Sequence, residues 1–420
     1  MRVLHLLDAA VLRPTDYRSR TLALIEQLRA QGVQTVHLAA PCLAVPSLSA
    51  LPGLSAVCAD ATPHGAAPAP HPGRCDANLP DPGWHIYRTA APAWLPAAVL
   101  QRLPARHAPA LSRAAAMAAF ALRVRRVARL TRPDLIHVHA GHGTAMAAFP
   151  ALCGARLPAV AEAGRRAADR TLPSWERWAL ERAGALAASS AELRAALRGA
   201  GLGGRRIRVI PPAAEFAGTP RRDPAPPGLA DAPLLAHAGG LEREAGIDLL
   251  LAVLPALRRR HPALRVVVAG GGAREDELAR RIGASAMRGR VAVTGAMPSR
   301  RVADLLPRAD IAVFPALCSA STPVASRHLL NAMAQGCAIV ASDIACHREL
   351  LVHGHSAMLF RAGSRHALAE TLARLLARPA LLPALGQAAA AQAAAQHSWP
   401  ATAARYRRLY QDVLAQARRG

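Results

Sequence analysis

Lysine is absent from this 420-residue chain, so the 52 residues of its lysine-plus-arginine total are all arginines. Arginine stays protonated and cannot form a Schiff base, which excludes mechanisms that depend on a lysine. Acidic residues number only 27, and the formal net charge is therefore +25. Such a charge favours anionic partners in general, although a compositional bias toward arginine, alanine, glycine and proline explains much of it.

Aromatic residues are also scarce, at 3% of the chain. This is too few to favour a stacking platform for single-stranded nucleic acid, so we expect no specific nucleic-acid partner. The seven cysteines form no Cys-x-x-Cys pair, which argues against a zinc ribbon and a disulfide framework. A reducing compartment is the simplest home for such a set.

Targeting signals are absent as well. The start carries Asp8 and no small-residue cleavage site, which argues against a signal peptide. No uninterrupted apolar run reaches the roughly 18 residues of a membrane span. The sequence therefore predicts a cytoplasmic protein.

Short apolar runs alternate with helical patterns along the chain, which is typical of parallel βαβ units. The first series of predicted strands covers 2–7, 33–39, 85–89, 134–139, 158–162, 185–189 and 207–211. The second series covers 234–239, 264–272, 291–295, 311–315, 338–342 and 356–360. The predicted fold class is α/β, with two Rossmann-like doubly wound domains. Ligands of such domains bind outside the carboxyl ends of the strands, so we expect the active site in a cleft between the two.

Composition also predicts the domain boundaries. Residues 213–232 hold many prolines and no periodic pattern, which is typical of a linker. They separate a first domain, 1–212, from a second, 233–397. Within the first domain, residues 41–83 are rich in proline, alanine and glycine and predict a surface insertion.

A basic amphipathic helix is predicted over 112–132, with six arginines, no acid and apolar residues at helical spacing. One interpretation is a helix that rests on an anionic membrane surface, which would make the protein peripheral at the inner membrane. The alternative is an ordinary core-facing helix with an arginine face toward water.

Glycines follow two strands of the second series. Gly239 and Gly240 end the strand at 234–239, and Gly270, Gly271 and Gly272 end the next. Without side chains, these loops let backbone N–H groups approach a phosphate. Similar turns are common in any α/β protein, so each loop alone is a weak signal.

A helix that begins at Pro323 gives a more specific signal. Ser321 or Thr322 can cap it and Gly336 ends it, so its N-terminus presents unpaired N–H groups and a partial positive charge to a diphosphate. Along this helix His328 and Asn331 lie about one turn apart, with Arg327 on a neighbouring face. The alternative is a capped structural helix with polar surface residues.

These residues carry a family resemblance. LLNAMAQGCAIVASDIACHREL, followed by HGHSAMLFRAGSRHALAETL, resembles the donor-binding segment of family 4 glycosyltransferases, which are retaining enzymes of the two-domain GT-B fold. The similarity continues through VAVTGAMPSRRVADLLPRADIAVFPA, RIRVIPPAAEF and PDLIHVHA and covers nearly the whole chain. SWPATAARYRRLY is similar to the family's closing helix, so residues 398–420 are expected to cross back to the first domain.

The wording is nearest to the glycosyltransferases associated with exosortase A and PEP-CTERM protein sorting, at LHLLD, IYRT and AMAQG. The resemblance implies a hexosyltransferase-type reaction with retention, in exopolysaccharide biosynthesis. The donor would be a nucleotide diphosphate sugar and the acceptor a glycan or lipid-linked saccharide. No cofactor and no metal are implied.

The resemblance also implies roles for single residues. His139 matches the family histidine that approaches the donor sugar, whereas His137, one pleat deeper, is interpreted as a core or support histidine. The predicted donor-binding residues are Gly239, Gly240, Arg243, Gly271, Thr322, Arg327, His328 and Asn331. The predicted acceptor-side residues are Asp16, Tyr17, Glu162 and Arg165.

Four positions depart from the family pattern. Gly240 and Ala245 stand where the family has an arginine and a lysine that grip the diphosphate, and Pro323 and Asn331 stand where it has two glutamates. Arg243 and Arg327 are candidates to replace the missing cations. The alternative hypothesis is a degenerate GT-B protein that lost catalysis and serves as a scaffold in a polysaccharide assembly complex.

Overall fold

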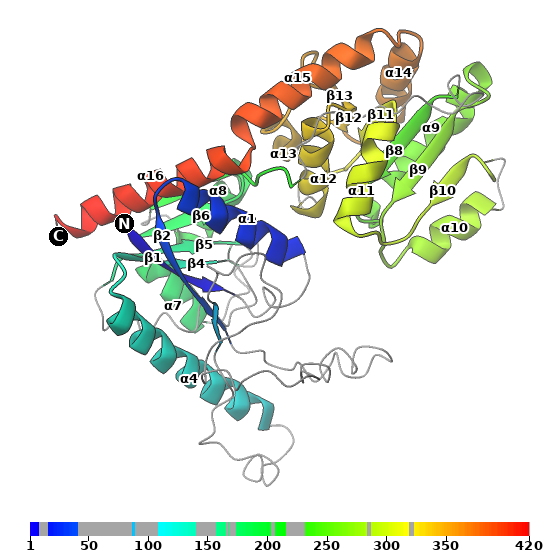
Figure 1. Cartoon of the computed structure of the whole chain (residues 1–420). Helices are drawn as coiled ribbons and strands as arrows, with labels where there is room; N and C mark the ends of the chain where they lie inside the picture. The colour runs from blue at the N-terminus through cyan, green and yellow to red at the C-terminus, as the bar shows by residue number, and fades with distance from the viewer. Residues whose placement is uncertain are drawn as a thin grey trace, which may run out of the picture. The chain divides into compact units, whose positions relative to one another are not determined.

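Two parallel sheets organise the chain (Figure 1). The computed structural model describes residues 1–7, 16–40, 86–88, 108–139, 157–164, 167, 174–202, 206–215, 232–283, 287–318 and 323–419. These residues divide into two units. The first comprises 1–189, 193–210 and 403–420, and the second comprises 190–192 and 211–402.

The sheet of the first unit has the strand order β3-β2-β1-β4-β5-β6-β7, and every pairing in it is parallel. Its strands are β1 (Arg2–Leu7), β2 (Gln34–Ala39), β3 (Ile86–Arg88), β4 (Leu135–Val138), β5 (Ala159–Glu162), β6 (Ala185–Ala188) and β7 (Arg206–Val209). Its helical elements are α1 (Asp16–Ala30), α4 (Ala108–Thr131), α7 (Ser174–Arg182), α8 (Ala191–Leu197) and η3 (Arg198–Leu202).

The sheet of the second unit has the order β10-β9-β8-β11-β12-β13, again parallel throughout. Its strands are β8 (Leu234–Ala238), β9 (Arg265–Ala269), β10 (Val291–Val293), β11 (Ile311–Phe314), β12 (Ala338–Ser342) and β13 (Met358–Phe360). Its helical elements are η4 (Arg243–Ala245), α9 (Ile247–Arg260), α10 (Glu275–Gly283), α11 (Ser299–Leu305), η5 (Leu306–Arg308), α12 (Pro323–Ala334), α13 (Ala345–Arg348), α14 (Arg365–Leu376) and α15 (Leu381–Gln396). A last helix, α16 (Trp399–Ala417), begins in the second unit and continues in the first.

Both faces of the first sheet are covered by helices. Alternate residues of a strand point to opposite faces, and Leu4 and Leu6 of β1 share a buried cluster with Phe120 of α4 and Leu180 of α7. His5, between those two leucines, points to the other face, where α16 lies. Figure 1 shows α4 and α7 on one side of this sheet and α1 and α16 on the other. The predicted doubly wound α/β class is confirmed.

The helix α4 supports the core-facing interpretation over its described side chains, which begin at residue 118. Phe120 and Val124 are fully buried, whereas Arg125 and Arg126 are exposed. Contact of this helix with a membrane stays a prediction. Of the helices that the structure describes, none combines the length and the apolar character that a bilayer crossing requires.

The second sheet lies between two layers of helices. On one face Leu235 and Val313 pack with α9 and α14, and on the other face Ala236 and Phe314 pack with α12 and α15. The central strands β8, β11 and β12 are buried on both sides, which explains why the sequence shows continuous apolar runs there instead of alternation.

Several predicted features lie outside the described residues. They are the insertion at 41–83, residues 216–231 of the linker, and the site candidates Thr322 and Arg165. Asp16 and Tyr17 form the start of α1, but their side chains are not among those described.

Candidate functional site

The strand order of the first sheet reverses at β1. The chain adds β2 and β3 on one side of β1 and then β4 to β7 on the other side. Such a switch point leaves a crevice outside the carboxyl ends of the strands, where α/β proteins bind ligands. Here the register sets three histidines in a row, since His5 is opposite His37 of β2 and His137 of β4. All three rings are buried, and His139 follows directly after β4.

Hydrogen bonds join these rings to the next strand and to α16. Nδ1 of His5 lies 2.9 Å from Nε2 of His139, and Nδ1 of His139 lies 3.4 Å from Oε1 of Glu162. The Tyr406 hydroxyl donates to the same Glu162 oxygen at 2.8 Å, and the Tyr410 hydroxyl lies 2.8 Å from Nδ1 of His137. Two tyrosines four residues apart on one helix face therefore hold the strand ends of β4 and β5.

Burial decides the protonation of this cluster. It lowers the pKa of His5 well below its usual range, with the neighbouring histidines adding to the effect, and lowers the pKa of His137 to about 4. Both rings are therefore neutral near pH 7. Burial alone would raise the pKa of Glu162, but the adjacent His139 and His137 outweigh it and hold that pKa well below its usual range. Glu162 is thus a carboxylate near pH 7, and it accepts the hydrogen bond of Tyr406.

The structure can be compared with the roles predicted for His137, His139 and Glu162. His137 is fully buried and bonded to Tyr410, so its interpretation as a core histidine is confirmed. The ring of His139 is 2% exposed, with one nitrogen facing His5 and the other facing Glu162. Its contact with a donor sugar, and that of Glu162 with an acceptor, stay predictions.

Sequence reasoning did not assign roles to His5, His37, Tyr406 and Tyr410. The signal was present in two places. The strands HLL, VHLA and HVH place histidines at equivalent depth, and the terminal helix repeats tyrosine at a spacing of four. Neither pattern by itself reveals that the tyrosines contact the histidines, because Tyr410 and His137 are 273 residues apart along the chain.

The second sheet has its own switch point, between β8 and β11. A small pocket lies at the ends of these strands, lined by Gly239, Gly240 and Glu242 after β8, by Phe314 of β11, and by His347 of α13. The predicted donor residues Gly239 and Gly240 thus lie where the topology places a ligand crevice.

Close backbone packing explains the glycines of this region. The Gly239 N–H donates to the Ala269 carbonyl at 3.0 Å and the Gly270 N–H to the Gly295 carbonyl at 3.1 Å. A Cβ at Gly270 would overlap the Gly239 carbonyl oxygen, and one at Gly240 would overlap the carboxylate of Glu242. An acid therefore lies beside the position where the resemblance places an arginine.

The polar residues of α12 meet at Glu215. The Asn331 amide oxygen accepts the Glu215 backbone N–H at 2.8 Å, and the Arg327 guanidinium lies 3.7 Å from the Glu215 carboxylate. Residues four apart on a helix lie on adjoining parts of its surface, so Arg327 and Asn331 can both reach Glu215. Asn331 is 1% exposed, and its amide nitrogen has no hydrogen-bond partner among the described residues. Its bond to a ribose hydroxyl stays a prediction, as does a donor contact of buried His328.

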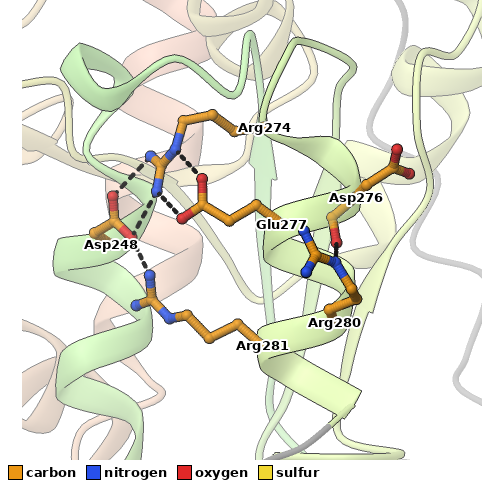
Figure 2. Close-up of polar contacts among 6 residues, drawn as sticks. All are labelled: Asp248, Arg274, Asp276, Glu277, Arg280 and Arg281. Atoms are coloured by element: carbon orange, nitrogen blue, oxygen red, sulfur yellow. Dashed lines mark hydrogen bonds and ion pairs between the residues drawn. The ribbon is translucent and has the colours of Figure 1, made fainter.

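An ion-pair network lies beside the second glycine loop (Figure 2). Arg274 donates to the Asp248 carboxylate of α9 at 2.8 Å and to the Glu277 carboxylate of α10 at 2.9 Å. These pairs hold the pKa of Asp248 below its usual value and raise that of Arg274. Arg243 lies close enough for its charge to help lower the pKa of Glu277, and it is itself exposed to solvent. Arg274 therefore already has acidic partners, whereas Arg243 remains a candidate for a phosphate contact.

Two family models match the chain. The family described as Glycosyltransferase Family 4 matches residues 19–216, and the one described as Glycosyl transferases group 1 matches residues 232–378. A glycogen synthase of Mycobacterium tuberculosis is 30% identical over 250 residues, which are 55% of this chain and 57% of that protein. A phosphatidyl-myo-inositol mannosyltransferase of Mycolicibacterium smegmatis is 32% identical over 131 residues, 31% of this chain and 32% of the relative. The chain thus spans between about a third and somewhat over half of these curated relatives.

Solved structures agree on the fold. A sucrose-phosphate synthase from Thermosynechococcus elongatus has a TM-score of 0.67 at 17% identity and covers 99% of this chain and 100% of its own. The Anabaena protein HepE, solved with UDP and glucose, has a TM-score of 0.61 at 16% identity, with 98% and 100% covered. These likenesses establish the GT-B architecture of the chain.

Proposed function

We propose a sugar-transfer reaction for this chain, on the premise that its two domains are those of a family 4-type glycosyltransferase of the GT-B fold. The donor is a nucleotide diphosphate sugar, the transferred group is a hexose, and the anomeric configuration is retained. The acceptor is a polysaccharide or lipid-linked saccharide in exopolysaccharide synthesis. The finer kinship with exosortase-associated enzymes belongs to this proposal and rests on the sequence resemblance alone.

The pocket at the β8–β11 switch point carries the proposal. It combines glycine loops, through which a backbone can approach a phosphate, with a position at the carboxyl ends of the strands. The negative charge that grows on a departing diphosphate needs preorganised donors or cations around it. Arg243 is the exposed arginine of the loop after β8, and we assign it that role. HepE was solved with UDP-glucose, which is why UDP is tested first.

Calorimetric titration of the full chain with UDP and with GDP tests donor binding. We expect one of the two to bind, and Arg243→Ala to weaken that binding about 10- to 100-fold, because a hydrogen bond to a charged group contributes about 1.5–3 kcal/mol. Arg259→Ala is the matched control, since Arg259 is also exposed but lies in the last turn of α9. It should bind as the wild type does.

Release of nucleoside diphosphate from UDP- and GDP-sugars, with a lipid extract as acceptor source, tests transfer. The proposal predicts release that depends on the acceptor and a product in which NMR shows the donor's anomeric configuration. If neither nucleotide binds and no nucleotide sugar is consumed, the chain is the degenerate scaffold and the proposed reaction is wrong.

A further inference from the structure

One ring nitrogen of His347, in α13, is buried without a hydrogen-bond partner among the described residues. The side chain is 0% exposed. Its Nδ1 lies 2.8 Å from the Ser342 carbonyl oxygen. A carbonyl can only accept a hydrogen bond, so Nδ1 of the neutral ring carries the proton and Nε2 carries a lone pair. The unpartnered nitrogen, Nε2, is therefore an acceptor that lacks a donor.

Buried polar atoms of native proteins are nearly always bonded to protein, ordered water or a ligand. A second buried ring beside His347 has more backbone contact. Nδ1 of His237 lies 2.9 Å from the Val313 carbonyl oxygen, and the Gly240 backbone is close enough to raise the pKa of His237 as well. Of the described residues, Ser342 alone acts on the pKa of His347 in this way. We therefore looked for the missing donor of His347 outside the protein.

His347 lines the pocket at the β8–β11 switch point. Small residues, among them Gly240 and Ala245, leave open a space there about the size of one water molecule or one hydroxyl group. Glu242 lines the same pocket, and its carboxylate can also only accept hydrogen bonds. The side chains around this space thus offer acceptors, and a small group that donates a hydrogen bond fits it.

A phosphate oxygen is a poor partner for Nε2 of His347, because it is an acceptor too. The two could bond only if the ring took up a proton. Burial lowers the pKa of His347 to about 4, so near pH 7 only about one ring in 1,000 is protonated. A hydroxyl donates to the neutral ring directly. A nucleotide diphosphate sugar carries hydroxyls on both sides of its phosphates, on the ribose and on the hexose.

We infer that Nε2 of His347 accepts a hydrogen bond from a hydroxyl of the bound nucleotide sugar, so that His347 helps to select the donor. Sequence reasoning assigned no role to this residue. The inference rests on the proposed function, because that function supplies the ligand. A hydroxyl of the hexose would make His347 select the sugar, and a hydroxyl of the ribose would make it select the nucleotide.

Calorimetric titration of the full chain with UDP-glucose and UDP, and with GDP-mannose and GDP, tests the contact. His347→Asn keeps an amide N–H near the place of Nδ1 but has nothing at Nε2, and we expect it to bind the donor about 3- to 10-fold more weakly. His347→Gln places an amide oxygen near the depth of Nε2 and should retain most of the affinity. His366→Asn is the matched control, because the His366 side chain is 92% exposed. A loss confined to the nucleotide sugar assigns the hydroxyl to the hexose, and an equal loss for the free nucleotide assigns it to the ribose.

Monodeoxy analogues of the donor identify the hydroxyl. One analogue should bind the wild type about 3- to 10-fold more weakly than the parent donor does, and should bind His347→Asn as tightly as the parent does. Circular dichroism checks that the variants are folded. The wild-type series needs no variant, and equal affinity for all the analogues would overturn the inference.

Two further outcomes separate this inference from the proposed function. If the wild type binds a nucleotide sugar and His347→Asn binds it equally well, Nε2 bonds only to water, so the inference is wrong and the proposed function stands. If the wild type binds none of the four ligands, donor binding itself is wrong and the inference falls with it.

Discussion

The two units share a sheet topology but have different residue types at the place where the strand order reverses. At the β1–β4 switch point of the first unit, imidazole rings, tyrosine hydroxyls and a carboxylate occupy the strand ends and bond to one another. At the β8–β11 switch point of the second, glycines bring backbones together and leave a small pocket. The topology therefore sets where the strand order reverses in each sheet, and the residue types decide whether side chains or the main chain occupy that place.

Two arginines near the strand ends of the second unit have acidic neighbours. In the second unit Arg274 is paired with Asp248 and Glu277 (Figure 2), and Arg327 lies near Glu215. The large positive net charge of the chain therefore does not make every arginine of this region available to a phosphate, because acids lie beside Arg274 and Arg327. The proposed donor site therefore relies on the exposed Arg243 for its positive charge.

The largest effect on stability is expected from adding a side chain at Gly270, where two backbone segments pack closely. Gly270→Ala would push a Cβ into the Gly239 carbonyl oxygen, and backbone atoms in a packed sheet cannot move aside cheaply. We expect a loss of at least about 4 kcal/mol in the free energy of unfolding, measured by urea titration. Gly283→Ala is the control, because no atom lies within 4 Å of a Cβ there. Equal stability of the two variants would show that the strand ends do not need glycine.

The next largest effect is a loss of folding stability at acid pH. Burial lowers the pKa of His347 to about 4 from 6.5, while its Nδ1–H donates to the Ser342 carbonyl at 2.8 Å. The unfolded chain therefore binds a proton between pH 6.5 and 4 that the folded chain does not, so stability falls as the pH is lowered through that window. A shift of this size corresponds to about 3 kcal/mol.

The matching variant is His347→Gln, which cannot take up that proton. Melting curves of wild type and variant between pH 7 and pH 4 should converge toward the acid end, since the variant lacks one source of acid sensitivity. His366→Gln is the control, because the His366 side chain is 92% exposed. Parallel curves for wild type and His347→Gln would contradict the neutral, buried state of this ring.

The smallest effect is expected in the arginine network. Asp248→Asn removes the acid that Arg274 and Arg281 share, but its side chain is 39% exposed, so water and salt screen the pairs. We expect a loss of no more than about 1 kcal/mol that shrinks further in 1 M salt. A larger loss that is independent of salt would mean that this network, and not the glycine packing, stabilises the loops.

Much of the fold was accessible from the sequence because its central strands are buried on both faces. The runs RVLHLL, AIVAS and IAVFP are continuous and apolar, and they form β1, β12 and β11 within one residue of the predicted bounds. Gly336, with φ of 70°, follows α12 as a residue that ends a helix should. Local pattern suffices for such elements, since period and capping act over a few residues.

The candidate site was accessible only in part. Gly239 and Gly240 could be located because a glycine loop after a strand is a local signal. The bond between Tyr410 and His137, or between Asn331 and the Glu215 backbone, could not, because each joins residues more than 100 positions apart. No local pattern encodes which distant side chain a polar group meets.

The sequence by itself determined two parallel α/β domains, the positions of their strands, a large positive charge and the glycine loops that follow β8 and β9 in the second domain. These follow from periodicity, composition and backbone sterics, all of which are local properties. Only the tertiary structure decided that His5, His137 and His139 form one buried cluster, and that α16 holds it with Tyr406 and Tyr410. The strand register and the position of the last helix bring these groups together. Their burial keeps the rings of His5 and His137 neutral near pH 7.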